Sequence, residues 1–464
     1  MAISTVRNLI RNAISLEDEG GAAPIVEVNV HVSKDAAEAD AAAADVEEAQ
    51  DDLDNQEADV NDQQEASEEV EDTAANLESI ALALEGALKE GGLGTQALTF
   101  ANISINNELR RLGLEEHKVS LESMGTASGR VAQTKISLET VMESIHKAIE
   151  AVKKFFLEIA RKINDFFAGF FGHVVRAKRY HDSLKKVAET QKSMKPAADA
   201  KVELPDYKFA KEDNDKKYET DPSKLASGFK ANAAIILKLD AFAKAIQKID
   251  ISKLESLIDS TFDKDHVEEK IKESTIELIN TGVISAEVVN AFGELMNSLE
   301  EDGIGGFVIA RHIYSSLGIL TKLGLRMKVG KKFTDMDANI NKTLKKEKGD
   351  FPVLSGENQL LMLSSVSSLI EAMEKFKPMS RQMVDGINST RDKIKKLIDD
   401  TMKKNDSSWF RRKESILGVM RIVSAANRAI MSINGGLFAL TMDILGYVHK
   451  SQKALAKSGS SEKK

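Results

Sequence analysis

The chain has 464 residues, of which 42% are hydrophobic and 5% aromatic, and it contains no cysteine. The absence of cysteine excludes disulfide scaffolds, thiolate zinc sites and cysteine nucleophiles. The net charge of −9 hides an asymmetry, because residues 1–139 hold 29 Asp+Glu against 9 Lys+Arg, whereas residues 140–464 hold 44 against 55. An acidic leader thus precedes a basic body, which is typical of chains with an acidic tail or a nucleic-acid-facing domain.

The first residues form a short amphipathic segment, with Ile3, Val6 and Ile14 on one face, and lack the apolar region of a secretory signal. Elsewhere no uncharged apolar stretch reaches the length of a spanning helix. The nearest candidate, residues 429–448, contains Asn434 and Asp443. We interpret it as a buried core helix.

Residues 18–75 are of low complexity, with alanines interspersed among acidic residues and only lone Val, Leu or Ala between positions 45 and 72. Such a segment buries too little apolar surface to offset the entropy of ordering the chain. It predicts disorder or a marginal helix, with a coiled coil as the alternative. The alternating run at residues 25–32 predicts a lone strand or a docking peptide.

Residues 76–139 have a more globular pattern. Helical spacing of leucines from Leu77 to Leu88 predicts one helix, Gly91 and Gly92 break it, and residues 100–109 predict a second short helix. The small-residue loop 125–129 is flexible enough for a protease to thread.

The body begins with a strongly amphipathic pattern over residues 141–171, followed by a second helix at 173–194, so residues 140–195 predict a helical hairpin. Residues 196–222 hold three of the six prolines and predict a linker, which ends at an Asp221-Pro222 helix start. Further helices are predicted across a helical body, residues 223–464, among them 357–375, 378–403 and 410–455. The expected fold is all-α: a bundle of long antiparallel helices preceded by an acidic, largely disordered or helical propeptide with parts at 1–75 and 76–139.

Catalytic motifs are missing from the sequence: it has no phosphate-binding glycine loop, no H-E-x-x-H and no G-x-S-x-G. His173 and His181 are eight residues apart on one predicted face, but no third or fourth ligand is in register with them. We therefore expect no enzyme activity, no cofactor and no metal site.

Basic residues recur through the body and predict phosphate contacts without sequence readout, because non-specific affinity comes from charge neutralisation. The candidate contacts are Lys153, Lys154, Arg176, Arg179, Arg411, Arg412 and Lys413. The phenylalanines of residues 141–171 also permit an interfacial membrane helix. We prefer their packing against other helices.

Tripeptides of the form Ser/Ala-x-Glu crowd the leader, and among them are those that end at Glu17, Glu85, Glu122 and Glu139. Asn76-Leu77-Glu78 is a relative that places Glu78 in the same set. As helix features they are ordinary, since serine caps helices and glutamate suits a first turn. Two of them lie at the charge boundary, on either side of the flexible loop.

Three stretches resemble the leaders of internal head proteins of giant phiKZ-like and related tailed phages. They are Leu-Glu-Gly-Ala-Leu-Lys-Glu-Gly-Gly-Leu at residues 84–93, Leu-Glu-Ser-Met-Gly-Thr-Ala-Ser-Gly-Arg at 121–130 and Ser-Leu-Glu-Thr-Val-Met-Glu-Ser-Ile at 137–145. The resemblance covers about residues 77–170. It implies an acidic propeptide that helps to pack the protein into the prohead and a prohead protease that cuts after glutamate in Ser/Ala-x-Glu. It marks Glu139 and Glu122 as the best cleavage positions, with Glu85, Glu78 and Glu17 as further ones.

Two functions follow as expectations. The first is a structural protein of the virion, made in the host cytoplasm, assembled with other capsid and core proteins, trimmed, and kept inside the capsid near packaged DNA. The alternative is a membrane-active helical protein, pore-forming or ejected to act at the host envelope.

Overall fold

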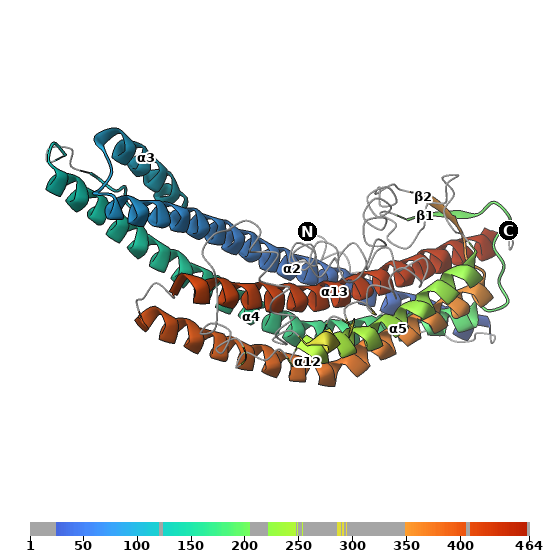
Figure 1. Cartoon of the computed structure of the whole chain (residues 1–464). Coiled ribbons are helices and arrows are strands. Elements are labelled where there is room, and N and C mark those ends of the chain that lie inside the picture. Colours follow the sequence, from blue (N-terminus) through green and yellow to red (C-terminus); the bar gives the residue numbers. More distant parts are fainter. Residues whose placement is uncertain are drawn as a thin grey trace, which may run out of the picture.

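The computed structural model describes residues 25–119, 124–204, 221–246, 349–404 and 409–461, with isolated residues between 248 and 294. Within these residues, helices of 49 to 65 residues lie side by side in an elongated bundle (Figure 1). The expected all-α class is thereby confirmed. The long helices are α2 (Ile25–Lys89), α4 (Ala127–Thr190), α12 (Gly356–Lys404) and α13 (Trp409–Ser461).

Helix α4 runs antiparallel to α2 and α12 and parallel to α13. Along α2 and α4, residues that touch change number in opposite directions, while along α4 and α13 they change in the same direction. The short helix α3 (Thr95–Arg111) lies at one end, and the strands lie toward the other (Figure 1). The contacts that establish these directions are Asp59–Lys162 and Glu38–Lys186 for α2 and α4, Phe170–Phe438 and Tyr180–His449 for α4 and α13, and Lys178–Glu374 with His181–Leu363 for α4 and α12.

Helix α2 occupies the segment for which disorder or a marginal helix was the leading prediction. Its lone apolar residues recur every seven positions and face the bundle, as in the coiled-coil alternative. A narrow stripe of this kind forms a stable helix here because α4 and α13 supply the apolar partners that the acidic segment lacks. The row of buried positions is Ala39, Val46, Leu53, Val60, Ser67, Ala74 and Ala81, accompanied by Ala49, Leu77 and Leu84.

Residues 25–32 are also helical, so the predicted strand is wrong. Valines are tolerated there because they extend a long helix that is nucleated elsewhere. The break after α2 is where the glycines predicted it. Gly92 has a φ of 86°, and a Cβ on it would come within 2.7 Å of the Arg130 backbone, so the turn packs closely on the first turn of α4.

Helix α4 is continuous from Ala127 to Thr190, in place of the hairpin expected over residues 140–195. Its start is capped by Thr126, whose side chain accepts a hydrogen bond from the Gly129 amide at 3.0 Å. No proline interrupts it, and Gly169 and Gly172 do not end it because apolar contacts continue on both sides, at Phe166, Phe167, Phe170 and Val174. The apolar stripe of residues 141–171 is buried as predicted.

The linker expected at 196–222 contains a strand, β1 (Lys201–Leu204), which pairs antiparallel with β2 (Gly349–Pro352). Local patterns did not predict this pair because its strands are four residues long and far apart in sequence. After the linker, α5 (Pro222–Ile246) begins as predicted: Asp221 Oδ1 accepts from the Ser223 amide at 2.8 Å. Helix α12 joins the two helices predicted at 357–375 and 378–403 and continues through Pro378.

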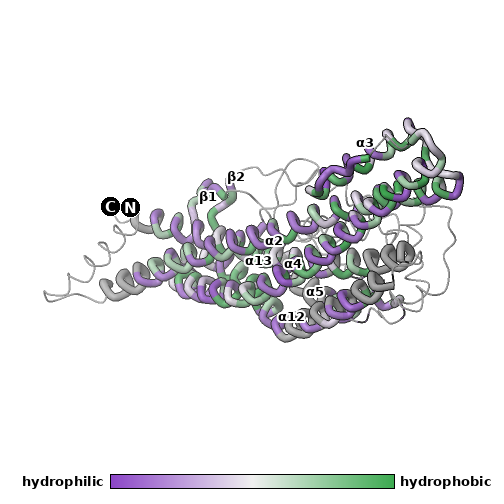
Figure 2. The backbone as a smooth tube through the Cα atoms, turned by 90° about the vertical axis from the view of Figure 1, so that its left-hand side faces the viewer, coloured by the Kyte–Doolittle hydropathy of each residue, from purple (hydrophilic) through white to green (hydrophobic). Residues whose placement is uncertain are grey.

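The buried residues form one continuous apolar cluster to which every long helix contributes. Along each helix, hydrophilic and hydrophobic residues alternate (Figure 2), as expected where one face packs and the other is exposed. Aromatic rings mark the centre of the cluster. Phe170 stacks on Phe166 with ring centroids 5.6 Å apart and meets Phe438 of α13 edge-on at 6.2 Å. These contacts join α4 to α13.

Candidate functional site: the seam between the acidic and basic helices

The long helices carry opposite charges. Helix α2 holds 20 acidic and 2 basic residues, a net charge of −18. Helix α4 holds 12 basic and 7 acidic residues, a net of +5, and α13 holds 8 basic and 2 acidic, a net of +6. We call the face where α2 packs on α4 and α13 the acid–base seam. Its polar members are Glu38, Asp40, Asp52, Glu57 and Asp59 of α2, Lys162, His173 and Lys186 of α4, and Arg428, Ser432, His449 and Lys453 of α13.

Asp40 is the centre of a polar chain that links three helices. Its carboxylate lies 2.9 Å from His449 Nε2 and 2.6 Å from Lys453 Nζ. On the other side of the imidazole, Tyr180 Oη lies 2.8 Å from Nδ1. Because a carboxylate only accepts, His449 donates from Nε2, and Nδ1 accepts from the tyrosine hydroxyl. Burial raises the pKa of Tyr180, which keeps this hydroxyl protonated.

Arg428 is a buried cation on α13, 6% exposed, that faces the acidic helix. Burial lowers the pKa of its guanidinium, and the carboxylates of Glu68, Glu57 and Glu65 oppose that shift. A buried charge is tolerated where opposite charges compensate its desolvation. Ser432, one turn further along α13, donates a hydrogen bond to Glu57. The acidic helix therefore supplies the counter-charges of Arg428.

Two lysines of α4 tie its exposed edge to α2. Lys162 Nζ lies 2.6 Å from Asp59, and Lys186 Nζ lies 3.7 Å from Glu38. Exposed ion pairs contribute at most about 1 kcal/mol each and weaken with salt. These pairs fix the orientation of α2, whereas the buried apolar row supplies most of its attachment.

His173 lies inside the seam with both ring nitrogens lacking a hydrogen-bond partner. The ring packs beside Phe438, with centroids 6.3 Å apart, and the nearest carboxylate, Asp52, is 3.7 Å away. Burial lowers the pKa of His173, nearby Arg176 lowers it further, and Asp52 opposes the shift. The folded protein therefore favours neutral His173.

Replacing this histidine changes the pH dependence of stability. The unfolded chain takes up a proton at His173 below about pH 6.5, while the folded chain does so only at lower pH, so its contribution to stability is lost as pH falls below that value. We expect His173→Leu to lose less stability than the wild type between about pH 7.5 and about pH 5.5 in urea unfolding. Asp52→Asn should lose more, because Asp52 favours the charged ring. Equal losses in all three proteins would contradict this assignment.

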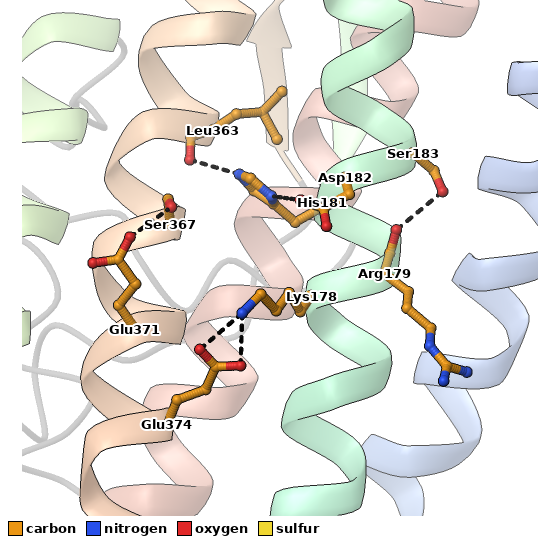
Figure 3. A network of polar contacts seen from close by, with 9 residues as sticks. All are labelled: Lys178, Arg179, His181, Asp182, Ser183, Leu363, Ser367, Glu371 and Glu374. Carbon is orange, nitrogen blue, oxygen red and sulfur yellow. Dashed lines mark hydrogen bonds and ion pairs between the residues drawn. The ribbon is translucent and has the colours of Figure 1, made fainter.

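The contacts between α4 and α12 are also polar (Figure 3). Lys178 Nζ lies 2.8 Å from Glu374, and His181 binds the Leu363 carbonyl at 3.0 Å through Nε2 and Asp182 at 2.9 Å through Nδ1. His181 thus faces α12, whereas His173 faces α2. Over the described parts of the chain, no group of three or more His, Cys, Asp or Glu residues could hold a metal ion.

The candidate phosphate contacts come from α4 and α13. Lys154, Arg176 and Arg179 are exposed on α4. The side chain of Lys153 is only 11% exposed and pairs with Glu150 of the same helix at 3.2 Å. The remaining candidates, whose side chains lie outside the described part, belong to the first turns of α13: Arg411, Arg412 and Lys413.

The candidate cleavage positions fall into two groups. Glu78 and Glu85 lie in α2 and Glu139 lies in α4, whereas Glu17 and Glu122 lie outside the described residues, before α2 and between α3 and α4. The Glu139 side chain is 66% exposed.

The serine of the Glu139 tripeptide is fully buried. Ser137 Oγ lies 3.1 Å from His117 Nε2, and Thr140 lies 3.2 Å from Nδ1 of the same ring. A protease that reads the serine must first open this part of α4.

Four of the six phenylalanines that permitted a membrane helix are interior residues, and the other two, Phe155 and Phe171, are half-buried. Phe156, Phe166, Phe167 and Phe170 are each at most 5% exposed. By length and composition, Ile430–Lys457 could span a membrane, but 83% of its apolar window is buried inside the protein. The interpretation of residues 429–448 as a buried core helix is confirmed, and the membrane-active alternative gains no support.

Sequence reasoning did not identify the seam. Its carboxylates Asp40, Asp52 and Asp59 looked like any others in an acidic segment. The available signal was the seven-residue spacing of Val46, Leu53 and Val60, which assigns one face of α2 to a partner and places flanking acids at its edges.

These features define an all-α protein whose acidic and basic helices pack in one bundle. The chain belongs to the family of phiKZ-like phage internal head proteins, which matches residues 27–458 and therefore includes α2. Membership places the protein inside the phage capsid, among other head proteins. No curated protein and no solved structure matches the chain.

Proposed function

We propose that this internal head protein enters the prohead as a precursor, is trimmed by the prohead protease after Ser-x-Glu, and stays beside the packaged DNA without reading its sequence. Family membership supports the structural role. The exposed cations Lys154, Arg176 and Arg179 of α4 support contacts with phosphates. The acidic leader is proposed to assist packaging.

Our choice of cleavage positions rests on the packing of α2 as a helix against α4 and α13. A protease binds an extended segment, so sites between helices cost less to open than sites within them. We propose cleavage after Glu122, which lies between α3 and α4 in the chain, and after Glu17, which precedes α2, in preference to Glu139, Glu85 and Glu78, which lie inside α4 and α2. A cut after Glu17 also precedes the first residue of the family match.

These two cuts differ in their electrostatic effect. Residues 18–464 carry a net charge of −10, so a cut after Glu17 changes little. Residues 123–464 carry 57 basic against 45 acidic residues, a net of +12, which is reached only if residues 1–122 leave. DNA affinity rises with the number of neutralised phosphates.

Mass spectrometry of purified virions tests the proposal through the N-terminal peptides of the mature protein. We expect peptides that begin at Asp18 or at Ser123. A start at Thr140 would overturn our preference for sites between helices. Intact N-termini in all mature particles would overturn the processing itself, with unprocessed proheads as the control that contains the precursor.

A further inference from the structure

We infer that the groove between α4 and α13 retains the acidic helix after the chain is cut between α3 and α4, so that the processed protein is a two-chain bundle. The occupant of the groove is α2 together with α3. The biological occurrence of the cut rests on the proposed function, whereas the interface is a property of the structure.

The apolar part of the interface is a protein core. Leu53 and Val60 are at most 1% exposed, as is Leu77, and they belong to one continuous cluster with Phe170 and Phe438. Apolar attachment of this kind does not weaken with salt, unlike exposed ion pairs. Removing α2 would expose this cluster to water along the length of the row.

Polar groups of α13 lose their partners on α2 if α2 departs. Arg428 would lose the carboxylates that compensate its burial, and His449 would lose Asp40. Water would hydrate both groups once α2 has left, so these contacts fix the register of α2 in the groove, and the buried apolar cluster supplies most of its attachment. The net charges of −18 on α2 and +5 and +6 on its two partners act in the same direction.

The proposed cut breaks none of these contacts. Cleavage after Glu122 breaks one peptide bond, between Glu122 and Ser123, and the residues described on either side remain attached to the bundle. On the leader side, Asn106 holds the His117 backbone through bonds of 3.0 and 2.6 Å, and His117 reaches Ser137 of α4. Cleavage alone therefore does not separate the basic fragment 123–464 from the acidic leader. A further event must open the bundle before that fragment is released.

An engineered cut in the full-length protein tests this inference without the phage protease. A site for a sequence-specific protease is inserted between Ser120 and Ser123, and the purified protein is cut to completion. We expect two fragments on a denaturing gel but one unchanged peak in native size-exclusion chromatography, at about 0.15 M and at about 1 M NaCl. Separate peaks at the lower salt would overturn the inference.

Two substitutions in α2, one at a buried position and one at an exposed position, test the interface directly. After cutting, Leu53→Ala should raise the dissociation constant of the leader fragment by about 30-fold or more. Ala58→Ser, at an exposed position of the same helix, should leave it unchanged. Equal affinities for the two variants would overturn the assigned interface, and uncut samples of each report whether the variant folds.

The fragment content of purified virions distinguishes failure of the inference from failure of the proposed function. Fragments 18–122 and 123–464 in equal amounts in mature particles would agree with both. Virions that lack a cut after Glu122, combined with co-elution of the engineered fragments, would overturn that cleavage position and leave the interface standing.

Discussion

Phe170→Ala is expected to lower the free energy of unfolding by about 3–5 kcal/mol, because it leaves a large cavity in a packed core. Phe170 is fully buried between Phe166 and Phe438, where α4 meets α13. Urea unfolding followed by circular dichroism measures the change through the midpoint at constant slope.

Phe100→Ala is the matched control. The same side chain at position 100 of α3 is 71% exposed, so its removal should change stability by no more than about 0.5 kcal/mol. Equal losses for the two variants would contradict the packing of α4 against α13.

A chain that begins at Thr140 is expected to lose cooperative unfolding and to aggregate. It lacks α2, α3 and the start of α4. The apolar residues of α4 and α13 that α2 covers would therefore face water along the whole seam. Thermal melting and native size-exclusion chromatography measure the outcome.

A chain that begins at Asp18 is the control for this truncation. It keeps every described helix and should melt within a few degrees of the full-length protein, since a loss of 1 kcal/mol shifts the midpoint by less than about 4 °C in a chain of this length. A monomeric, cooperatively melting 140–464 fragment would show that the acidic helix is dispensable for folding.

The sequence predicted the fold class because the body has continuous amphipathic patterns. It underestimated α2, since a marginal helix is stabilised by distant partners that a local window does not contain. Val46, Leu53 and Val60 are separated by acids, and only their seven-residue period reveals the buried face. Charge asymmetry, by contrast, was visible in composition alone.

Pairings between distant segments could not be predicted in the same way. Strands β1 and β2 bring Val202 beside Phe351, and neither short segment carries a strand pattern long enough to identify. Arg428 is an ordinary basic residue in the sequence. Its importance depends on the burial that α2 imposes, which is a property of the packed bundle.

The continuity of α4 has a mechanical consequence. At 1.5 Å per residue, its 64 residues span about 96 Å. α3 lies at one tip of the bundle and the strand pair toward the other (Figure 1). The exposed Phe100 and Ile103 of α3 thus sit at one extremity of a stiff rod. The two ends of the bundle, and any surface that they carry, are therefore held at a fixed distance by one uninterrupted helix.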